Sequence, residues 1–130
     1  MENVRASGLI AIKLNDGDNL EWVKTSTGSD DIVLATAAGI AISFNEKMVR
    51  AMGRVASGVR GLKLKGSDKV VGMEVVTKDE AKEGRLFLAI MENGFGKRTD
   101  IEEYKSQGRG GMGIKTAQIT PKTGKLVSAY

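Results

Sequence analysis

The sequence predicts an all-β fold made of repeated four-stranded antiparallel blades, arranged as in a propeller. Three observations support this prediction. Apolar residues come in short runs with a period of two, which is typical of strands. Landmarks of the sequence recur at a regular spacing, as in repeat architectures: Gly8, Gly58 and Gly113 lie in matching surroundings. Only 1 proline occurs in 130 residues, whereas proline would remove hydrogen-bond donors from central strands.

The repeat is visible in landmarks along the whole chain. The stretch 7–14 returns as 57–64, and a third copy begins at Gly113. The second spacing is five residues longer than the first. The extra residues fall near 78–82, a charged stretch that we expect to be an enlarged hairpin loop, because insertions cost little there. We therefore predict a single repeat domain, 1–130, with the units 8–57, 58–112 and an incomplete 113–130.

Each unit is expected to contain the same elements in the same order. The predicted strands are 8–14, 19–25, 31–37 and 40–44 in the first unit, and 58–64, 69–77, 85–91 and 95–99 in the second. The tight turns at 15–18 and 92–94 contain residues that tolerate positive φ. A short helical turn follows each fourth strand, and Asp100 and Glu103 have the spacing of a capping box. A glycine-rich basic link, 52–58 or 107–113, then ends each unit.

The repeat arithmetic limits the architecture. A closed propeller needs at least about four blades, whereas this chain has two complete units and the opening strands of a third. We therefore expect an open set of about two and a half repeats that is part of a longer protein; the alternative is that the chain associates to cover its exposed strand edges.

The composition excludes most familiar catalytic chemistry. The chain has no histidine and no cysteine, which removes imidazole bases, thiol nucleophiles, disulfides and ordinary zinc sites. We interpret the loop acids Asp16, Asp18, Asp30 and Asp31 as turn residues; an enzyme site made of carboxylates would require such acids to converge. We predict no catalytic residue, metal or cofactor in this chain. Because it lacks a secretion signal and a membrane-spanning run, we expect it to be cytoplasmic.

The charge is distributed unevenly within the unit. Residues 15–31 have a net charge of −4 and residues 45–65 a net charge of +5, within a total of +4. A weaker basic stretch recurs from Lys97 to Lys115. If the units follow one another around an axis, the basic stretches form a track that suits a phosphate backbone. The alternative is that these residues only solvate a β surface. With few aromatic residues to stack on bases and no long helix for a groove, duplex DNA bound without sequence readout is favoured.

Several long strings of the sequence resemble the C-terminal domain of the DNA gyrase A subunit. They are 31–34, 39–44, 49–54, 58–64, 70–73 and 92–99. The resemblance implies a six-bladed β-pinwheel whose blades exchange strands and whose basic rim bends and wraps duplex DNA. It also implies a parent type II topoisomerase in the cytoplasm, associated with the nucleoid, that supercoils DNA negatively. In that enzyme the remaining domains of the A subunit join the B subunit in an A2B2 assembly. ATP, magnesium and the catalytic residues lie outside this chain.

One motif departs from the family pattern. The signature heptapeptide is Gln, two bases, two glycines, a base and a glycine. Here it is a degenerate form that lacks two of the bases: Gln107, Gly108, Arg109, Gly110, Gly111, Met112 and Gly113. The similar domain of the topoisomerase IV A subunit is one alternative. A β-repeat module that binds protein, with incidental basic charge, is another.

The candidate DNA contacts are basic residues in and around the links. Arg50, Arg54, Lys105 and Arg109 recur at equivalent places. We predict that replacing Arg54 and Arg109 by alanine weakens DNA binding to a similar degree on unrelated DNA sequences. The supporting set is Arg60, Lys63, Lys65, Lys97, Arg98 and Lys115.

Overall fold

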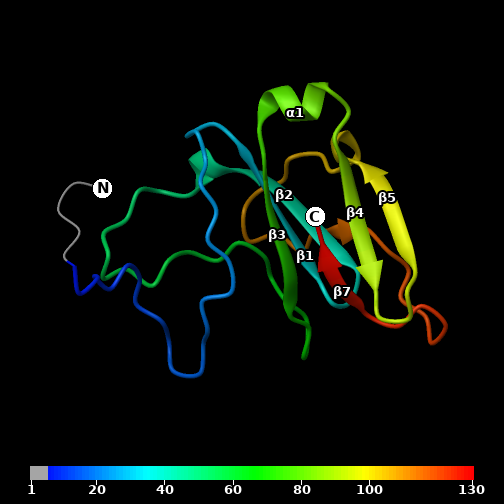
Figure 1. Cartoon of the computed structure of the whole chain (residues 1–130), viewed down its shortest axis with the longest axis horizontal. Coiled ribbons are helices and arrows are strands. Elements are labelled where there is room, and N and C mark those ends of the chain that lie inside the picture. The colour runs from blue at the N-terminus through cyan, green and yellow to red at the C-terminus, as the bar shows by residue number, and fades with distance from the viewer. Residues whose placement is uncertain (1–5) are drawn as a thin grey trace.

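The computed structural model describes residues 6–130, so the first five residues of the predicted domain lie outside the described residues. Short strands dominate it, with one α-helix and two 3₁₀ turns in the described part (Figure 1). The elements are β1 (Asp31–Thr36), β2 (Ile40–Asn45), η1 (Glu46–Met48), β3 (Val70–Val76), α1 (Lys78–Lys82), β4 (Leu86–Met91), β5 (Gly96–Asp100), η2 (Ile101–Glu103), β6 (Ile114–Lys115) and β7 (Leu126–Ala129).

Within residues 6–130 the strands form two antiparallel sheets. The first sheet has the order β3-β1-β2-β6 and the second the order β5-β4-β7. The first sheet takes β1 and β2 from the first predicted unit, β3 from the second and β6 from the third. The second sheet takes β4 and β5 from the second unit and β7 from the third. The predicted all-β class is therefore confirmed, and the sheets exchange strands between units as the resemblance implies.

Backbone contacts recur with the same spacing as the sequence landmarks. Lys13 N–H donates to the carbonyl of Ala56 at 3.1 Å, and Lys63 N–H donates to that of Gly111 at 2.9 Å. Both the donors and the acceptors are equivalent positions of successive units. The irregularity in the β1–β3 pairing also recurs, at the equivalent place, in the β4–β7 pairing. These matches support the repeat, while its unit boundaries stay a prediction.

The predicted strands divide into two groups. Those at 31–37, 40–44, 69–77, 85–91 and 95–99 are confirmed to within one residue at each end. Those at 8–14, 19–25 and 58–64 are wrong, because the described residues there have no regular secondary structure. A strand needs a neighbour to satisfy its backbone groups. The stretch 58–64 corresponds to the one that contains β6, which pairs with β2, whereas 58–64 has no paired strand among the described residues.

The five extra residues form a helix instead of the expected loop. In α1, the Thr77 hydroxyl accepts from Glu80 N–H at 3.2 Å, and the Glu80 carboxylate accepts from Thr77 N–H at 2.9 Å. This reciprocal capping box stabilises a single helical turn. The capping box expected at Asp100 and Glu103 is wrong, because the Asp100 carboxylate accepts from Glu102 N–H and so caps the tighter 3₁₀ turn η2.

The core lies mainly between the two sheets. Because side chains alternate along a strand, successive residues of β1 face opposite sides. Val33 and Ala35 face this core. Ile32 and Leu34 pack on the opposite face in a second cluster, whose buried residues are Ile42, Phe44 and Leu62. Gly72 allows β7 to approach β3, since a Cβ there would lie 2.9 Å from the Ala129 carbonyl oxygen. Among the described residues, no helix is long and apolar enough to cross a membrane.

Candidate nucleic-acid interface

The basic residues predicted to contact DNA lie mostly at the surface. Nine of the ten are exposed, whereas Arg109 is half-buried. The exposed residues are Arg50, Arg54, Arg60, Lys63, Lys65, Lys97, Arg98, Lys105 and Lys115. Their positions on links, turns and strand edges place the charges where a large polyanion can reach them.

None of these ten side chains forms an ion pair with an acid of the described part of the chain. The ion pairs found there instead use Lys24, Lys82 and Arg85 with Glu74, Asp79 and Glu80. The acids found in ion pairs therefore neutralise basic residues outside the candidate set. The ten positive charges have no paired carboxylate to neutralise them, which favours the binding of phosphates.

The second link, residues 107–113, lies along the edge of β2. Gln107 N–H donates to the carbonyl of Ser43 in β2 at 2.7 Å. Gly113 has a φ of +70°, and a Cβ there would lie 2.6 Å from the carbonyl oxygen of Ala41. Only glycine combines this backbone conformation with so close an approach. Gly113 of the degenerate motif therefore allows the link to pack directly against a strand.

Arg109 holds the second link against η1 and against the start of the second unit. Gly110 N–H donates to the carbonyl of Gly61 at 2.7 Å. The guanidinium of Arg109 donates to the carbonyl of Met48 through Nε at 3.1 Å and to that of Arg60 through Nη1 at 2.7 Å. Two of its donor nitrogens are therefore engaged with backbone. This geometry gives Arg109 a positioning role that the sequence did not indicate.

The first link, residues 52–58, contains the equivalent arginine in a different setting. Ala56 N–H donates to the carbonyl of Gly53 at 3.1 Å, matching a bond from Gly111 N–H to Gly108 at 3.2 Å. The two links therefore turn alike. However, Arg54 is exposed and forms no hydrogen bond with any described residue, so its guanidinium is free to bind a ligand.

Two candidate residues lie on the edge strand β5. Lys97 stands at the position where the first unit has the fully buried Ile42. Its Nζ donates to the carbonyl of Thr116 at 2.9 Å, so part of its hydrogen-bonding capacity is used between segments. Arg98 is exposed and has no such contact with the described residues. Lys97 is thus partly structural, whereas Arg98 is fully available.

Asp18 and Asp30 act within local turns, whereas Asp31 lies in β1 and contacts its cross-strand partner in β2, so the interpretation of Asp31 as a turn residue is wrong. The Asp18 carboxylate accepts from the Asn15 side chain, Asp30 accepts from Thr27, and Asp31 accepts from Asn45. Within residues 6–130, no group of three or more acids is arranged to hold a metal ion.

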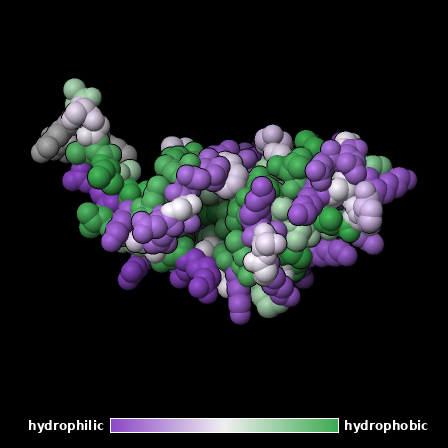
Figure 2. Space-filling view, turned by 90° about the horizontal axis from the view of Figure 1, so that it is seen from below, coloured by the Kyte–Doolittle hydropathy of each residue, from purple (hydrophilic) through white to green (hydrophobic). Residues whose placement is uncertain are grey.

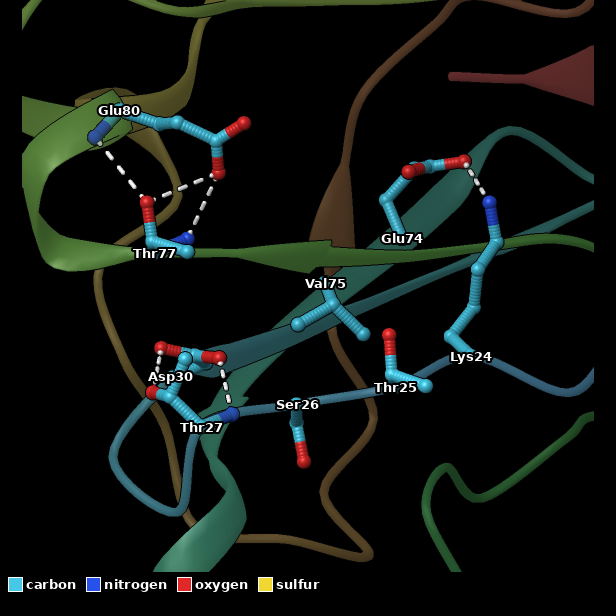
Figure 3. Close-up of a pocket in the computed structure, with 9 residues that line it drawn as sticks. All are labelled: Lys24, Thr25, Ser26, Thr27, Asp30, Glu74, Val75, Thr77 and Glu80. Carbon is cyan, nitrogen blue, oxygen red and sulfur yellow. Dashed lines mark hydrogen bonds and ion pairs between the residues drawn. The ribbon is translucent and has the colours of Figure 1, made fainter.

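A hydroxyl-rich recess of about 360 Å³ lies between the segment 24–30 and β3 (Figure 3). Lys24 reaches across it and pairs with Glu74 at 3.1 Å. On its other side, hydrogen bonds from the backbone N–H and hydroxyl of Thr77 lower the pKa of Glu80 below its ordinary value, and Arg85 adds to this effect. Its acids are already engaged, so this recess has no free charge for a phosphate.

Glu46 binds the same segment from the start of η1. Its carboxylate accepts hydrogen bonds from the Ser26 hydroxyl and from the backbone N–H groups of Asp30 and Gly28. These bonds, that of Ser26 most strongly, lower the pKa of Glu46. Glu46 therefore stabilises the entry to β1, and its carboxylate is engaged there.

The chain matches a known family over most of its length. The model of the family described as DNA gyrase C-terminal domain, β-propeller, matches residues 3–26, 30–77 and 92–130. The DNA gyrase A subunit of Salmonella typhimurium is 43% identical over 125 residues, which are 96% of this chain and 14% of that protein. The DNA gyrase A subunit of Staphylococcus epidermidis is 42% identical over 124 residues, which are 95% of this chain and 14% of that protein.

Two solved structures are similar to this chain. The DNA gyrase A C-terminal domain is 31% identical with a TM-score of 0.81, over 95% of this chain and 41% of that chain. The C-terminal domain of DNA topoisomerase IV has a TM-score of 0.84 over 97% of this chain and 38% of that chain, but at 24% identity it shows only the fold. The chain spans 14% of the length of the curated relatives named above. The family model matches most residues of the chain, and the fold aligns with a solved DNA gyrase A C-terminal domain. This chain therefore belongs to the family described as DNA gyrase C-terminal domain, β-propeller.

Proposed function

We propose that this chain binds duplex DNA without reading its sequence and bends or wraps it, within a DNA gyrase A subunit. The observation that carries this proposal is the recurring set of basic residues around the two links, none of which is paired with an acid of the described part. A duplex offers regularly spaced phosphates, and each lysine or arginine that neutralises one releases a counterion.

Sequence-independent binding follows from the elements available. The longest helix among the described residues is α1, with 5 residues, which is too short to lie along a major groove and read base edges. Short links with glycine next to arginine suit close contact with the sugar-phosphate backbone. Contacts with phosphates fix position but not sequence.

The role of the whole protein extends this proposal. By family membership, the parent would introduce negative supercoils using ATP, together with the gyrase B subunit, in the bacterial cytoplasm. This chain would supply the DNA wrapping, and the catalytic tyrosine, ATP and magnesium would belong to other parts of the parent.

Resealing a nicked circular plasmid with ligase in the presence of the chain tests the proposal directly. Wrapping changes the linking number that is trapped at closure, whereas simple coating does not. We expect the topoisomer distribution to shift in proportion to bound protein. A distribution identical to that of the protein-free plasmid would exclude wrapping by this chain.

The salt dependence of duplex binding tests the assigned residues. Replacing both Arg50 and Arg54 by glutamine should reduce the slope of log affinity against log salt by about 1.8, on any sequence. The matched control replaces Lys78 and Lys82 of α1, which are also exposed, and should leave the slope unchanged. Equal effects of the two pairs would reject the links as the interface.

Exposed apolar side chains favour a second candidate, a module that binds protein. Ile10, Val23 and Val55 expose 79%, 77% and 85% of their surface, and exposed apolar patches commonly mark protein contacts. This candidate predicts little DNA affinity at physiological salt. The titration described above distinguishes it from the first.

A further inference from the structure

A second basic feature lies apart from the links, at the end of the first sheet opposite α1. There a recess of about 560 Å³ is lined by Ala37 and Ala38 of the β1–β2 turn, by the turn 65–69, and by Ile119 and Lys125. Since β3 starts directly after this turn and runs toward α1, the recess lies toward the lower side of Figure 1. Figure 2 shows the molecule from that side, with many hydrophilic residues standing around hydrophobic surface.

The fold alone brings the basic residues of this recess together. Ala37 N–H donates to the carbonyl of Lys69 at 2.9 Å, and Leu126 N–H donates to the carbonyl of Ala37 at 3.0 Å. Lys69 precedes β3 and Lys125 precedes β7, so they lie far apart in the sequence. The two backbone bonds fix both segments beside the same turn, which explains why no local pattern of the sequence indicated the pair.

The residues that line the recess have a net positive charge. Glu92 is not among them, but its carboxylate accepts a hydrogen bond from the backbone N–H of Lys125 at 3.4 Å. Lys65, Lys69 and Lys125 are exposed, and none forms an ion pair within the described part of the chain. The one acid in the lining is Asp68, whose Oδ1 already accepts from the N–H groups of Ala38 and Lys69, both at 2.9 Å. The lining therefore has a net charge of +2, with its carboxylate committed to holding the turn.

Neutral donors add to the lysines. No described group accepts a hydrogen bond from the backbone N–H of Gly66 or Ser67, and both residues are exposed. The hydroxyl of Ser67 supplies another donor. Ammonium groups combined with free N–H and O–H donors are the groups that proteins use to bind phosphate oxygens.

We propose that this recess binds a phosphate group, supplied either by the backbone of duplex DNA or by a free diphosphate or triphosphate. The equivalent place in the second sheet supports the assignment by contrast. There, at the corresponding positions of the next unit, Glu92 stands in place of Ala37 and Thr120 in place of Lys65. A carboxylate at that point repels phosphate, so the second sheet lacks the same site. With DNA as the source, the inference deepens the proposed function and rests on it.

The first test uses inorganic pyrophosphate as the probe and the complete 130-residue chain. We expect pyrophosphate to shift the amide resonances of residues 66, 67, 69 and 125. The double variant Lys69→Gln and Lys125→Gln should weaken this binding by about tenfold or more, because two charge-assisted hydrogen bonds are lost. The control Lys78→Gln and Lys82→Gln removes the same charge from α1 and should bind like the unmodified chain.

The second test measures the salt slope of duplex binding with the same variants. If DNA supplies the phosphate, the Lys69→Gln and Lys125→Gln pair reduces the slope by about 1.8 and the control pair does not. If only the pyrophosphate affinity changes, the site takes a free phosphate. If neither measurement separates the two pairs, the recess is not a phosphate site. The proposed function is tested separately. Its tests are duplex binding by the unmodified chain and the reduced salt slope of the variant with Arg50 and Arg54 replaced by glutamine.

Discussion

The two links have similar sequences and local turns but different surroundings. Arg54 and Arg109 occupy corresponding positions in successive units. The guanidinium of Arg109 donates to the carbonyls of Met48 and Arg60, because the second link lies between β2 and the stretch around Arg60. Arg54 has no such neighbours among the described residues and is exposed. The repeated motif therefore has the same local turn in both links, and the neighbouring segments determine whether its arginine binds backbone carbonyls or is available to a ligand.

The largest expected effect concerns the glycines that end each link. Gly58 and Gly113 have φ values of +84° and +70°, but a Cβ at Gly113 would lie 2.6 Å from the Ala41 carbonyl, whereas at Gly58 the nearest atom is 3.9 Å away. Gly113→Ala should therefore lower the free energy of unfolding by about 3 kcal/mol, through strain and overlap. Gly58→Ala should cost only about 1 kcal/mol, from strain alone. Urea unfolding measures both. Equal losses would show that the two links pack alike.

A smaller effect is expected at the end of η2, just before the second link. Tyr104 is buried, packs edge-to-face on Phe87 with ring centroids 5.3 Å apart, and shares a hydrogen bond with the buried Thr116 hydroxyl. Its counterpart in the first unit is Val49, which has no hydroxyl. Tyr104→Phe should cost about 1.5 kcal/mol, because the Thr116 hydroxyl loses its partner.

Removing both partners provides the control for that prediction. The double variant Tyr104→Phe and Thr116→Val should recover most of the loss, since no buried polar group is left unpaired. Thermal or urea unfolding of the single and double variants gives the coupling. If the losses are simply additive, the hydroxyl pair does not hold the second link in place.

The two arginines should separate stability from DNA binding. Arg109→Ala should lower the free energy of unfolding by about 1 kcal/mol, because two carbonyls lose a charged donor. Arg54→Ala should change it by less than about 0.5 kcal/mol, yet reduce the salt slope of DNA binding by about 0.9. The sequence alone predicted that both arginines are phosphate contacts. Equal slopes and equal stabilities for the two variants would restore that prediction.

The smallest expected effect is a dependence on pH at the acidic entry to β1. Hydrogen bonds lower the pKa of Glu46 below its ordinary value of 4.5. A carboxyl with a lowered pKa in the folded state stabilises the fold above its unfolded pKa, and this contribution is lost as the pH falls below about 4.5. Glu46→Gln should therefore lose less stability between about pH 7 and about pH 3.5 than the unmodified chain, as urea midpoints would show. Identical pH profiles would mean that these bonds do not form in solution.

Strands were predictable from the sequence where the fold pairs them with a neighbouring strand. The alternation in 31–37 and 40–44 identified β1 and β2 because a strand with one buried face carries that pattern locally. The same pattern in 8–14 and 58–64 did not yield strands. Alternating apolar residues indicate only a preference for extended backbone, and a strand also needs a neighbouring strand to pair with. The helix at 78–82 was missed, although Thr77 and Glu80 have the spacing of a capping box.

For the candidate interface, the sequence by itself determined the repeat spacing, the exclusion of histidine and cysteine chemistry, and the separation of acidic from basic stretches. These are properties of composition and local order. The tertiary structure decided that Arg109 binds backbone, that Lys97 contacts Thr116, and that Lys69 and Lys125 share a recess. Each of those outcomes depends on segments that are distant in the sequence, and a local pattern contains no information about which distant segment the fold places beside it.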